Sequence, residues 1–546
     1  MAKAGRRTNP IILRAGMSIG ANAAELDDEF LLPCFIHHPP VAQCIGMNSR
    51  GMVIDGRTGS GKTAILKYIS AQMQRTTEID PFDMSMSYVS NSDVLNFLHA
   101  IGADLDLLFQ VLWKHVLCIE FIRLRFQVSD ETRSTGVFQW IAERFNRDAR
   151  KQRAIKYLKQ WEGKFWVTMD QNIKEITEKV ENAVKAELGA EIEKFKAGGQ
   201  YDKRLSVGKK SEFVSRVRKI INSDQLAELG GVIEILAEVE RDESAMKNYY
   251  ILIDRLDEGW VDVSLRFKLT RALIESLKSF RKIRDLKILL AIRSDVLERV
   301  VQETRDLTFQ REKLDDYFVH LKWTKPLLKE LVDKRIRSLF KKQYTGGEIG
   351  FDDVFPFNVG NANPFDYIID RTLMRPRDAI AFVNECLEAA QGTYEVTGTT
   401  IKKAEINFSR IRRDTLEQEW QSAFPTIKRL LDLISSRPKA QFSSTELCSS
   451  NDVDSLALEI YSQPKIDYDP VYEAAKAHCD GSAPGILFKT IVSILYRVGA
   501  VGVKLRTGER YSFAHIDHPL LSISQIPDED FSIRIHPMLW GTFRIN

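Results

Sequence analysis

The sequence predicts an α/β protein built around a parallel sheet, and two observations carry this prediction. Short, almost continuously apolar runs alternate with segments of helical periodicity, which is typical of parallel strands buried on both faces. A complete Gly-x-x-x-x-Gly-Lys-Thr motif at 56–63 joins one predicted strand to a predicted helix. With 546 residues, 44% of them hydrophobic, the chain is long enough for about three or four domains.

Five strands, preceded by one helix, are expected between residues 23 and 323. The helix is expected over 23–35, and the strands over 51–56, 84–89, 249–254, 287–292 and 317–323. Helical periodicity separates the strands, so each pair is joined by a crossover that makes the strands parallel.

A long charged stretch, 125–245, separates the second expected strand from the third and is predicted to be an inserted helical subdomain. Its clearest part has apolar residues spaced by three and four positions, which places them on one face of a helix. These residues are Ile173, Ile176, Val180, Val184, Leu188, Ile192 and Phe195. Two interpretations stay open, a helix packed on its own domain and a coiled-coil arm that contacts another subunit.

The sequence motif at 56–63 predicts a phosphate site. Its glycines let the backbone N–H groups surround a phosphate at a helix N-terminus, where the helix dipole also favours an anion. We expect Lys62 to bridge the β- and γ-phosphates and the Thr63 hydroxyl to bind Mg²⁺. The expected nucleotide contacts are Gly56, Arg57, Thr58, Gly59, Ser60, Gly61, Lys62, Thr63 and Ala64. The predicted cofactors are therefore ATP and Mg²⁺.

Acidic residues follow the most apolar strand, which ends at Asp254. Because ligands of parallel sheets bind at the carboxyl ends of the strands, Asp254 is the expected magnesium carboxylate. Glu258 is the expected base that orients the attacking water, and Asp257 is the alternative. For either acid, a plain salt bridge is the other interpretation.

Arginines near the same edge are candidate phosphate sensors. Arg293 follows the next strand and is expected near the γ-phosphate, whereas a capping pair with Asp295 or Glu298 is the alternative. Further along, a guanidinium at the start of a helix could reach the phosphates on domain closure. Arg377 is the expected sensor there, with Arg375 as the alternative. Candidates for an arginine finger are Arg305 and Arg311.

The C-terminal part predicts a winged-helix-like domain, because a helix at 487–498 is followed by strand-like runs at 501–504, 510–513 and 532–536. Basic and aromatic side chains gather there and could bind a DNA backbone, or they could form a solvated or protein-docking face. They are Lys489, Tyr496, Arg497, Lys504, Arg506, Arg510 and Tyr511. His515, Asp517 and His518 could be drawn as a metal site, but no fourth ligand lies nearby in the sequence.

Composition and the search for targeting signals indicate where the protein is located and what it could bind. Lys and Arg total 78 against 75 Asp and Glu, a net charge of +3, so any nucleic-acid patch must be local. The longest weakly charged run, 107–122, still contains Lys114 and Glu120, so we expect no membrane span. The six cysteines form no C-x-x-C pair, and the apolar stretch at 10–13 is too short for a signal peptide. A cytoplasmic protein with reduced thiols is expected.

Taken together, these motifs resemble the AAA+/STAND superfamily of P-loop ATPases, in the ASCE class, over about 23–410. The resemblance rests on 56–63, the D-x-x-D-E form at 254–258, Arg293-Ser294 and Arg375-Pro376-Arg377. More narrowly, 24–27, 34–36, 253–260 and 535–539 are similar to a bacterial group of P-loop ATPases associated with antiphage defence. The resemblance implies ATP hydrolysis and places Phe35 and Ile36 beside the adenine.

The predicted architecture is a parallel P-loop NTPase sheet with an inserted helical subdomain, a helical lid and a C-terminal winged-helix-like domain. The expected boundaries are an N-terminal arm at 1–22, the P-loop core at 23–124 and 246–325, the insertion at 125–245, the lid at 326–412 and the winged-helix-like domain at 413–546.

Three functional hypotheses follow from these residues and the resemblance. The first is a regulatory ATPase of a bacterial defence system, which forms a homo-oligomer and controls its assembly or a co-encoded effector protein. The second is a DNA-binding AAA+ ATPase that acts in replication, repair or transposition and grips double-stranded DNA through its winged helix. In the third, ATP is a bound stabiliser with negligible hydrolysis.

Overall fold

The chain forms two compact units. The first, here the helical unit, comprises Met1–Ile36, Thr58–Gly61 and Lys322–Asn546, and the second, the sheet unit, comprises His37–Arg57 and Lys62–Leu321. The computed structural model describes residues 11–81, 94, 95, 98, 105–128, 131–145, 152–160, 174, 177, 178, 181–186, 223–241, 247–261, 263–303, 315–341, 347–437, 439–448, 451–464, 469–482 and 485–545.

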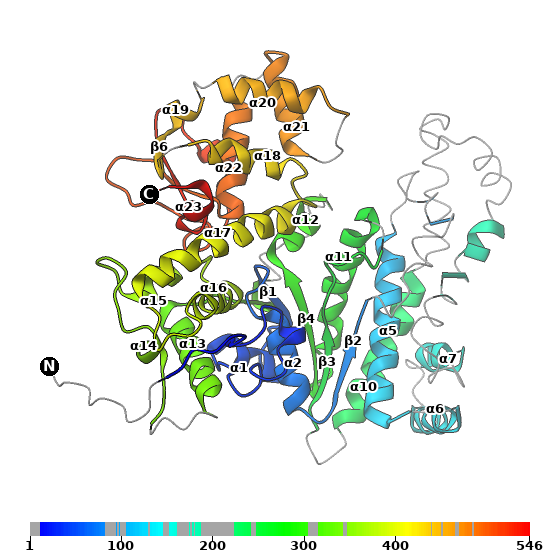
Figure 1. The fold of residues 1–546 in the computed structure, drawn as a ribbon. Helices are drawn as coiled ribbons and strands as arrows, with labels where there is room; N and C mark the ends of the chain where they lie inside the picture. Colours follow the sequence, from blue (N-terminus) through cyan, green and yellow to red (C-terminus); the bar gives the residue numbers. More distant parts are fainter. Residues whose placement is uncertain are drawn as a thin grey trace. The chain divides into compact units, whose positions relative to one another are not determined.

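A five-stranded parallel sheet, in the order β2-β3-β4-β1-β5, forms the centre of the sheet unit (Figure 1). The strands are β1 (Val53–Gly56), β2 (Thr76–Ile79), β3 (Tyr249–Ile253), β4 (Leu286–Arg293) and β5 (Phe318–His320). All five residues of β3 are buried, as are all but the last of β4. The predicted parallel α/β class is therefore confirmed.

The strand register brings the carboxyl ends of the strands to one edge. In β1, Gly56 is opposite Arg293 of β4, and Asp55 is opposite His320 of β5. In β2, Ile79 is opposite Ile253, the last residue of β3. Side chains that follow different strands, far apart in the sequence, are therefore neighbours at this edge.

Helices and a large apolar core support the sheet. The helices of the sheet unit are α1 (Pro39–Ile45), α2 (Lys62–Gln72), α5 (Asp106–Phe126), α6 (Glu131–Phe145), α7 (Gln152–Gln160), α10 (Ser223–Arg241), α11 (Val263–Phe280), α12 (Ser294–Glu303) and η3 (Asp315–Tyr317). Helix α5 contacts α10, α11 and β3, so it is buried on most sides. Its Trp113 donates a hydrogen bond to the Leu269 carbonyl at 2.8 Å. This packing explains why the run 107–122 is so apolar.

The helical unit contains mainly helices and a second, small sheet. Its first helices are η1 (Ala24–Leu26), α13 (Lys325–Phe340), α14 (Phe351–Val354), α15 (Pro364–Ile369), α16 (Pro376–Ala389) and α17 (Gly398–Trp420). The next are α18 (Ile427–Ser435), α19 (Ser444–Cys448), α20 (Asn451–Tyr461), α21 (Pro470–Cys479), α22 (Ile486–Val498), η4 (Ile523–Gln525), η5 (Pro537–Leu539) and α23 (Trp540–Phe543). Strands β6 (Gln441–Ser443), β7 (Val501–Lys504) and β8 (Ser532–Ile535) pair antiparallel in the order β6-β8-β7.

Two sequence expectations differ from the structure, and a third cannot be compared with it. The predicted helix over 23–35 is wrong, since only η1 forms and turns follow it; Pro33 disfavours helical backbone at the residue before it. The strand expected over 84–89 lies outside the described residues, and β2 is instead a short, half-polar Thr-Thr-Glu-Ile run that periodicity did not reveal. At 510–513 an isolated bridge joins Val503 and Ser512, and no strand forms.

The described part of the expected insertion, 125–245, is helical in α6, α7 and α10. Of the predicted apolar stripe, Val184 has a buried side chain, and the other six positions lie outside the described residues. Among the described helices, none combines the length and hydropathy needed to cross a bilayer. The described thiols of Cys34, Cys44, Cys118, Cys386 and Cys479 are free, and all but Cys479 are buried.

Residues 11–36 pack into the core of the helical unit. Ile11, Leu13 and Ile19 are buried there, so this part of the expected N-terminal arm is a packed segment. The Leu13 backbone bonds Gly392 and Thr393, and the buried Arg335 of α13 donates to Asp27 at 2.6 Å and to the Ile19 carbonyl at 2.8 Å.

We expect Arg335→Met to lower the free energy of unfolding by about 3–5 kcal/mol, because it leaves the buried Asp27 carboxylate without its cation. Urea unfolding followed by tryptophan fluorescence measures this change. The control is Arg337→Met on the same helix, whose pair with Glu348 is exposed and should matter by less than about 1 kcal/mol. Equal losses in the two variants would contradict the role of the buried pair.

Candidate functional site

The loop between β1 and α2 contains two residues in the left-handed region of φ. Gly59 has φ of 74° and Gly61 has φ of 96°, conformations that side chains with a Cβ rarely adopt. At Gly59 an added Cβ would also lie 2.7 Å from the Cβ of Arg377. Glycine is therefore required at both positions by backbone conformation, and at Gly59 by the neighbouring side chain as well.

Lys62 begins α2, and its ammonium returns to the loop. Its Nζ donates to the carbonyls of Gly56 at 3.0 Å and Arg57 at 3.1 Å, and the side chain is buried. Burial lowers the pKa of Lys62, and the nearby carboxylates of Asp254 and Asp257 oppose that change. The positive charge is thus held at the mouth of the loop by two carbonyl dipoles.

Thr63 and Asp254, the expected metal ligands, meet at the carboxyl edge of the sheet. The Thr63 hydroxyl donates to Asp254 Oδ2 at 2.7 Å, and the Arg255 backbone N–H donates to Asp254 Oδ1 at 2.9 Å. Burial raises the pKa of Asp254, although both hydrogen bonds and Lys62 act in the opposite direction. The carboxylate is therefore a half-buried acid whose anionic form a further cation would stabilise.

A tight turn after Asp254 carries the two candidate bases. Arg255 has φ of 60°, and the Glu258 N–H donates to its carbonyl at 3.1 Å. The Arg255 guanidinium pairs with Asp80 at 3.1 Å and with Glu258 at 3.7 Å. The Glu258 side chain is 48% exposed, and partial burial still raises its pKa against the attraction of Arg255.

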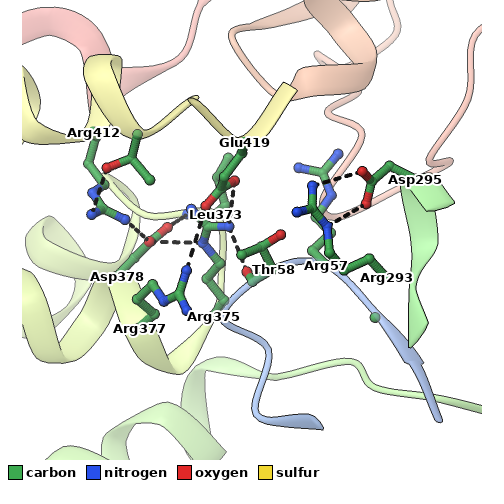
Figure 2. Close-up of polar contacts among 12 residues, drawn as sticks. Arg57, Thr58, Arg293, Asp295, Leu373, Arg375, Arg377, Asp378, Arg412 and Glu419 are labelled. Atoms are coloured by element: carbon green, nitrogen blue, oxygen red, sulfur yellow. Dashed lines mark hydrogen bonds and ion pairs between the residues drawn. The ribbon is translucent and has the colours of Figure 1, made fainter. Parts of the chain in front are cut away.

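Arg293, at the end of β4, is engaged by two carboxylates. Its Nε and Nη2 bond both oxygens of Asp295 at 3.0 and 2.8 Å (Figure 2), and its Nη1 lies 3.3 Å from Asp257 Oδ2. The alternative considered for Arg293, a capping pair with Asp295, is thus the observed geometry. The guanidinium also links α12 to the turn that holds the candidate bases.

One further carboxylate at this edge was missed by sequence reasoning. Asp55, buried in β1, accepts a hydrogen bond from the Ser294 hydroxyl at 2.6 Å, and its other oxygen lies 3.0 Å from His320 Nδ1. An aspartate inside the apolar run before the glycine motif was the available signal. The partners come from β5 and from the start of α12, which the sequence alone does not place beside β1.

In the helical unit, three donors hold successive carbonyls of the loop. The indole N–H of Trp323 donates to Ser60 at 2.7 Å, Arg375 Nη1 donates to Thr58 at 2.6 Å, and the backbone N–H of Arg377 donates to Gly59 at 3.4 Å. Trp323 had no predicted role. Arg375 and Arg377, the two arginines predicted to sense phosphate, both contact the loop by donating to its backbone carbonyls.

Arg375 belongs to a buried network of charges between α16 and α17 (Figure 2). Asp378 accepts from Arg375 at 2.8 Å, from Arg412 at 2.7 Å and from the Leu373 N–H at 3.0 Å, while Glu419 lies 3.1 Å from Arg375. Burial alone would raise the pKa of Asp378, but the two arginines hold it below its ordinary value. Two cations and two anions therefore balance in this interior.

Arg377 is bound less tightly than Arg375. Its Nε donates to the Asn22 carbonyl at 3.2 Å, its Nη1 lies 3.9 Å from Glu419, and the side chain is 28% exposed. Burial lowers its pKa, and the neighbouring charge of Arg375 acts in the same direction. Its positive charge is the surplus of the network.

The other expected site residues are more scattered. Phe35 and Ile36 lie in the helical unit, where Ile36 is buried in the core and the Phe35 carbonyl accepts from Lys334 at 3.4 Å. Ala64 lies in the first turn of α2. The candidate fingers Arg305 and Arg311 lie outside the described residues. Within the described ranges, no group of three or more His, Cys, Asp or Glu is placed to hold a metal ion, at 515–518 or elsewhere.

Comparison with known proteins gives two matches. Residues 326–417 match the family described as the FunZ-associated C-terminal helical domain. The chain is also 21% identical over 311 residues to the "Putative transposon gamma-delta 80.3 kDa protein" of Escherichia coli (strain K12). That alignment covers 56% of this chain and 41% of the relative, so the chain matches less than half of the relative's length. The chain is thus a distant homologue of a transposon protein.

We expect Asp378→Asn to cost about 3–5 kcal/mol of unfolding free energy at neutral pH, because two buried arginines lose their shared anion. A carboxylate with a lowered pKa stabilises the fold above its ordinary pKa of 3.8 and loses that effect as the pH falls through the folded value. The difference between wild type and variant should therefore shrink as urea unfolding is repeated below 3.8.

The matched control for this variant is Asp414→Asn on α17, where the Asp414 side chain is exposed. It should change the unfolding free energy by less than about 1 kcal/mol. A pH-independent difference for Asp378→Asn would contradict the electrostatic origin of its stabilisation.

Proposed function

We propose that this chain is a Mg²⁺-dependent ATP-binding and ATP-hydrolysing regulatory ATPase with a P-loop NTPase core. The observation that carries the proposal is the meeting of Thr63 with Asp254 at 2.7 Å, next to Lys62, at the carboxyl edge of a parallel sheet. This arrangement combines a hydroxyl, a carboxylate and an ammonium beside a glycine-rich loop. Those are the groups that bind a nucleoside triphosphate and its metal ion.

The sheet order supports this proposal. Strand β1, which leads into the loop, lies between β4 and β5, and β3 delivers Asp254 two strands away. Parallel sheets bind ligands at the carboxyl ends of their strands. Arg293 and Arg377 are our proposed γ-phosphate sensors, and Phe35 and Ile36 our proposed adenine contacts.

Mg²⁺ is proposed to bind at Thr63 and Asp254, because both offer the hard oxygen ligands that this ion prefers. The half-buried Asp254 carboxylate, whose pKa is raised by desolvation, fits a neighbouring cation. When bound, the ion would neutralise the phosphate oxygens.

Hydrolysis is proposed to use Glu258 to orient and deprotonate the attacking water. Its pKa is raised above the ordinary value for glutamate, which makes it a better base than an unperturbed carboxylate. Asp257 is the alternative, but its carboxylate lies 3.3 Å from the Arg293 guanidinium. We therefore place Asp257 as the partner that orients Arg293.

Lys62→Ala is expected to weaken MgATP binding by roughly 10- to 100-fold, because a buried charged donor to the phosphates is lost. Titration calorimetry of the purified chain measures the affinity. Lys67→Ala is the control, since Lys67 lies later on the same helix. Equal affinities of wild type and Lys62→Ala would reject the proposed phosphate site.

Glu258→Gln should retain MgATP binding but lower kcat by about 100- to 10,000-fold, the range typical of a lost general base. Asp257→Asn is compared in the same steady-state assay of ADP release. A larger kcat loss in Asp257→Asn than in Glu258→Gln would exchange their roles. Background turnover by wild type and Glu258→Gln alike would favour a bound stabiliser without hydrolysis.

The regulatory part of the proposal is that ATP controls homo-oligomer assembly or a co-encoded effector in a bacterial defence system. It rests on the motif resemblance and on the helical unit, whose donors Trp323 and Arg375 bond the phosphate loop. Such contacts can convert nucleotide binding into a change in the helices.

The resemblance to a protein named for a transposon favours a second candidate, a DNA-directed ATPase. We infer a winged-helix-like fold for α18–α22 with β6, β7 and β8, yet α22 is largely buried and its Tyr496 is 2% exposed. Lys489 pairs with Asp528, and Arg497 lies over Trp420 and Phe424. Contact with DNA phosphates by the turn after β7 is therefore more plausible than base reading by α22.

For this candidate, charge reversal of Lys504, Arg506 and Arg510 together should weaken binding to duplex DNA and reduce its salt dependence. Fluorescence anisotropy at several salt concentrations measures both. Weak binding that the triple variant leaves unchanged would reject the DNA-directed candidate, while ATP hydrolysis that rises with DNA would support it.

A further inference from the structure

The loop carbonyls of Thr58, Gly59 and Ser60 are bonded in sequence by Arg375, Arg377 and Trp323. In a trans peptide group the C=O of one residue and the N–H of the next point in opposite directions. Holding these three carbonyls therefore aims the N–H groups of Gly59, Ser60 and Gly61 away from the donors. Successive N–H groups with a glycine in the left-handed region form an anion-binding nest.

We propose that Trp323 and Arg375 are positioning residues, which set nucleotide affinity by fixing the orientation of these loop N–H groups. The inference rests on the proposed nucleotide site and names how that site is preorganised. Neither side chain needs to touch the nucleotide, because each acts through a backbone carbonyl.

The chemistry of each donor suits this role. Trp323 offers a single indole N–H on a rigid ring, and its Cζ2 would lie 3.8 Å from a Cβ at Gly61, so the ring also borders the loop. Arg375 is 3% exposed, and Asp378 and Glu419 balance its charge (Figure 2). A guanidinium engaged by two carboxylates and a carbonyl is committed to these partners.

Arg377 differs from Arg375 in this respect. It reaches Gly59 with its backbone N–H, a first-turn donor of α16 that has no partner within its own helix. Its guanidinium carries the surplus charge of the network and is the group proposed to sense the γ-phosphate. Loss of Arg375 and loss of Arg377 should therefore affect the ratio of ATP to ADP affinity differently.

The test measures MgATP and MgADP affinity of the full chain by titration calorimetry. Trp323→Phe removes the indole donor together with part of the ring that borders the loop, and it should weaken binding of both nucleotides by about three- to tenfold. Arg375→Met should weaken both by about 10- to 100-fold. In each case the ratio of ATP to ADP affinity should stay within about twofold of wild type, whereas Arg377→Met should lower that ratio.

Two control variants remove similar groups elsewhere in the helical unit. Trp540→Phe removes an indole donor to the Ile535 carbonyl, and Arg371→Met breaks a largely buried pair with Glu405 at 2.7 Å. Both should leave nucleotide affinity unchanged. Equal weakening by these controls, a changed ATP to ADP ratio in Trp323→Phe, or unchanged affinities in both positioning variants would overturn the inference.

Hydrogen exchange of the backbone amides at 56–63, measured without nucleotide, separates this inference from the proposed function. Exchange should be faster in Trp323→Phe than in wild type and unchanged in Trp540→Phe. Faster exchange in a chain that binds neither nucleotide would reject the ATPase and the effect on affinity, and would keep only the ordering of the loop by Trp323. Nucleotide binding by wild type together with unchanged exchange in Trp323→Phe would keep the nucleotide site and reject the positioning role of Trp323.

Discussion

A loop that presents its N–H groups to an anion must turn its carbonyls the other way, and carbonyls that leave water need donors. Here five successive carbonyls have one. The Lys62 ammonium bonds those of Gly56 and Arg57, and donors of the helical unit bond those of Thr58, Gly59 and Ser60. The glycine motif alone makes the loop possible, but these donors define its shape.

The same principle governs the carboxylates at the edge of the sheet. Asp254 is bonded by Thr63, and Asp55 lies between Ser294 and His320. At the same edge, the Arg293 guanidinium forms ion pairs with Asp257 and Asp295. Asp55 and Asp254 lie on different strands or strand ends, and parallel register brings partners from other strands within reach of Asp55. Removing one partner would leave a buried anion, which is costlier than losing a surface pair.

The sequence was sufficient for the sheet class and for placing Asp254 at the same sheet edge as the glycine-rich loop. Apolar runs revealed β3 and β4, and the end of the β3 run placed Asp254 at the carboxyl edge of the sheet, where Thr63 contacts it. The sequence was insufficient where an element is too short to show a period, or where a contact joins residues far apart in the chain. Strand β2 has too few apolar residues to show a period, Pro33 interrupts an otherwise helical pattern, and the link from Trp323 to Ser60 joins residues that no local pattern connects. Arg375 was weighed only as a phosphate contact, because its acceptors come from three separate segments.

The core of the helical unit contains both Leu13 and Leu539, whereas the sheet unit lies within 37–321. A ribosome makes the sheet unit in full before the first helix of α13–α17 exists. Ile11, Leu13 and Ile19 are then without the apolar surface that covers them in the finished fold, because α13 and α16 are still to be made. Domains fold as units in the order of synthesis, so the sheet unit folds first and the N-terminal segment packs only once α13 and α16 have been made. A chaperone that holds this segment during translation would therefore act on the helical unit and leave the folding of the sheet to proceed alone.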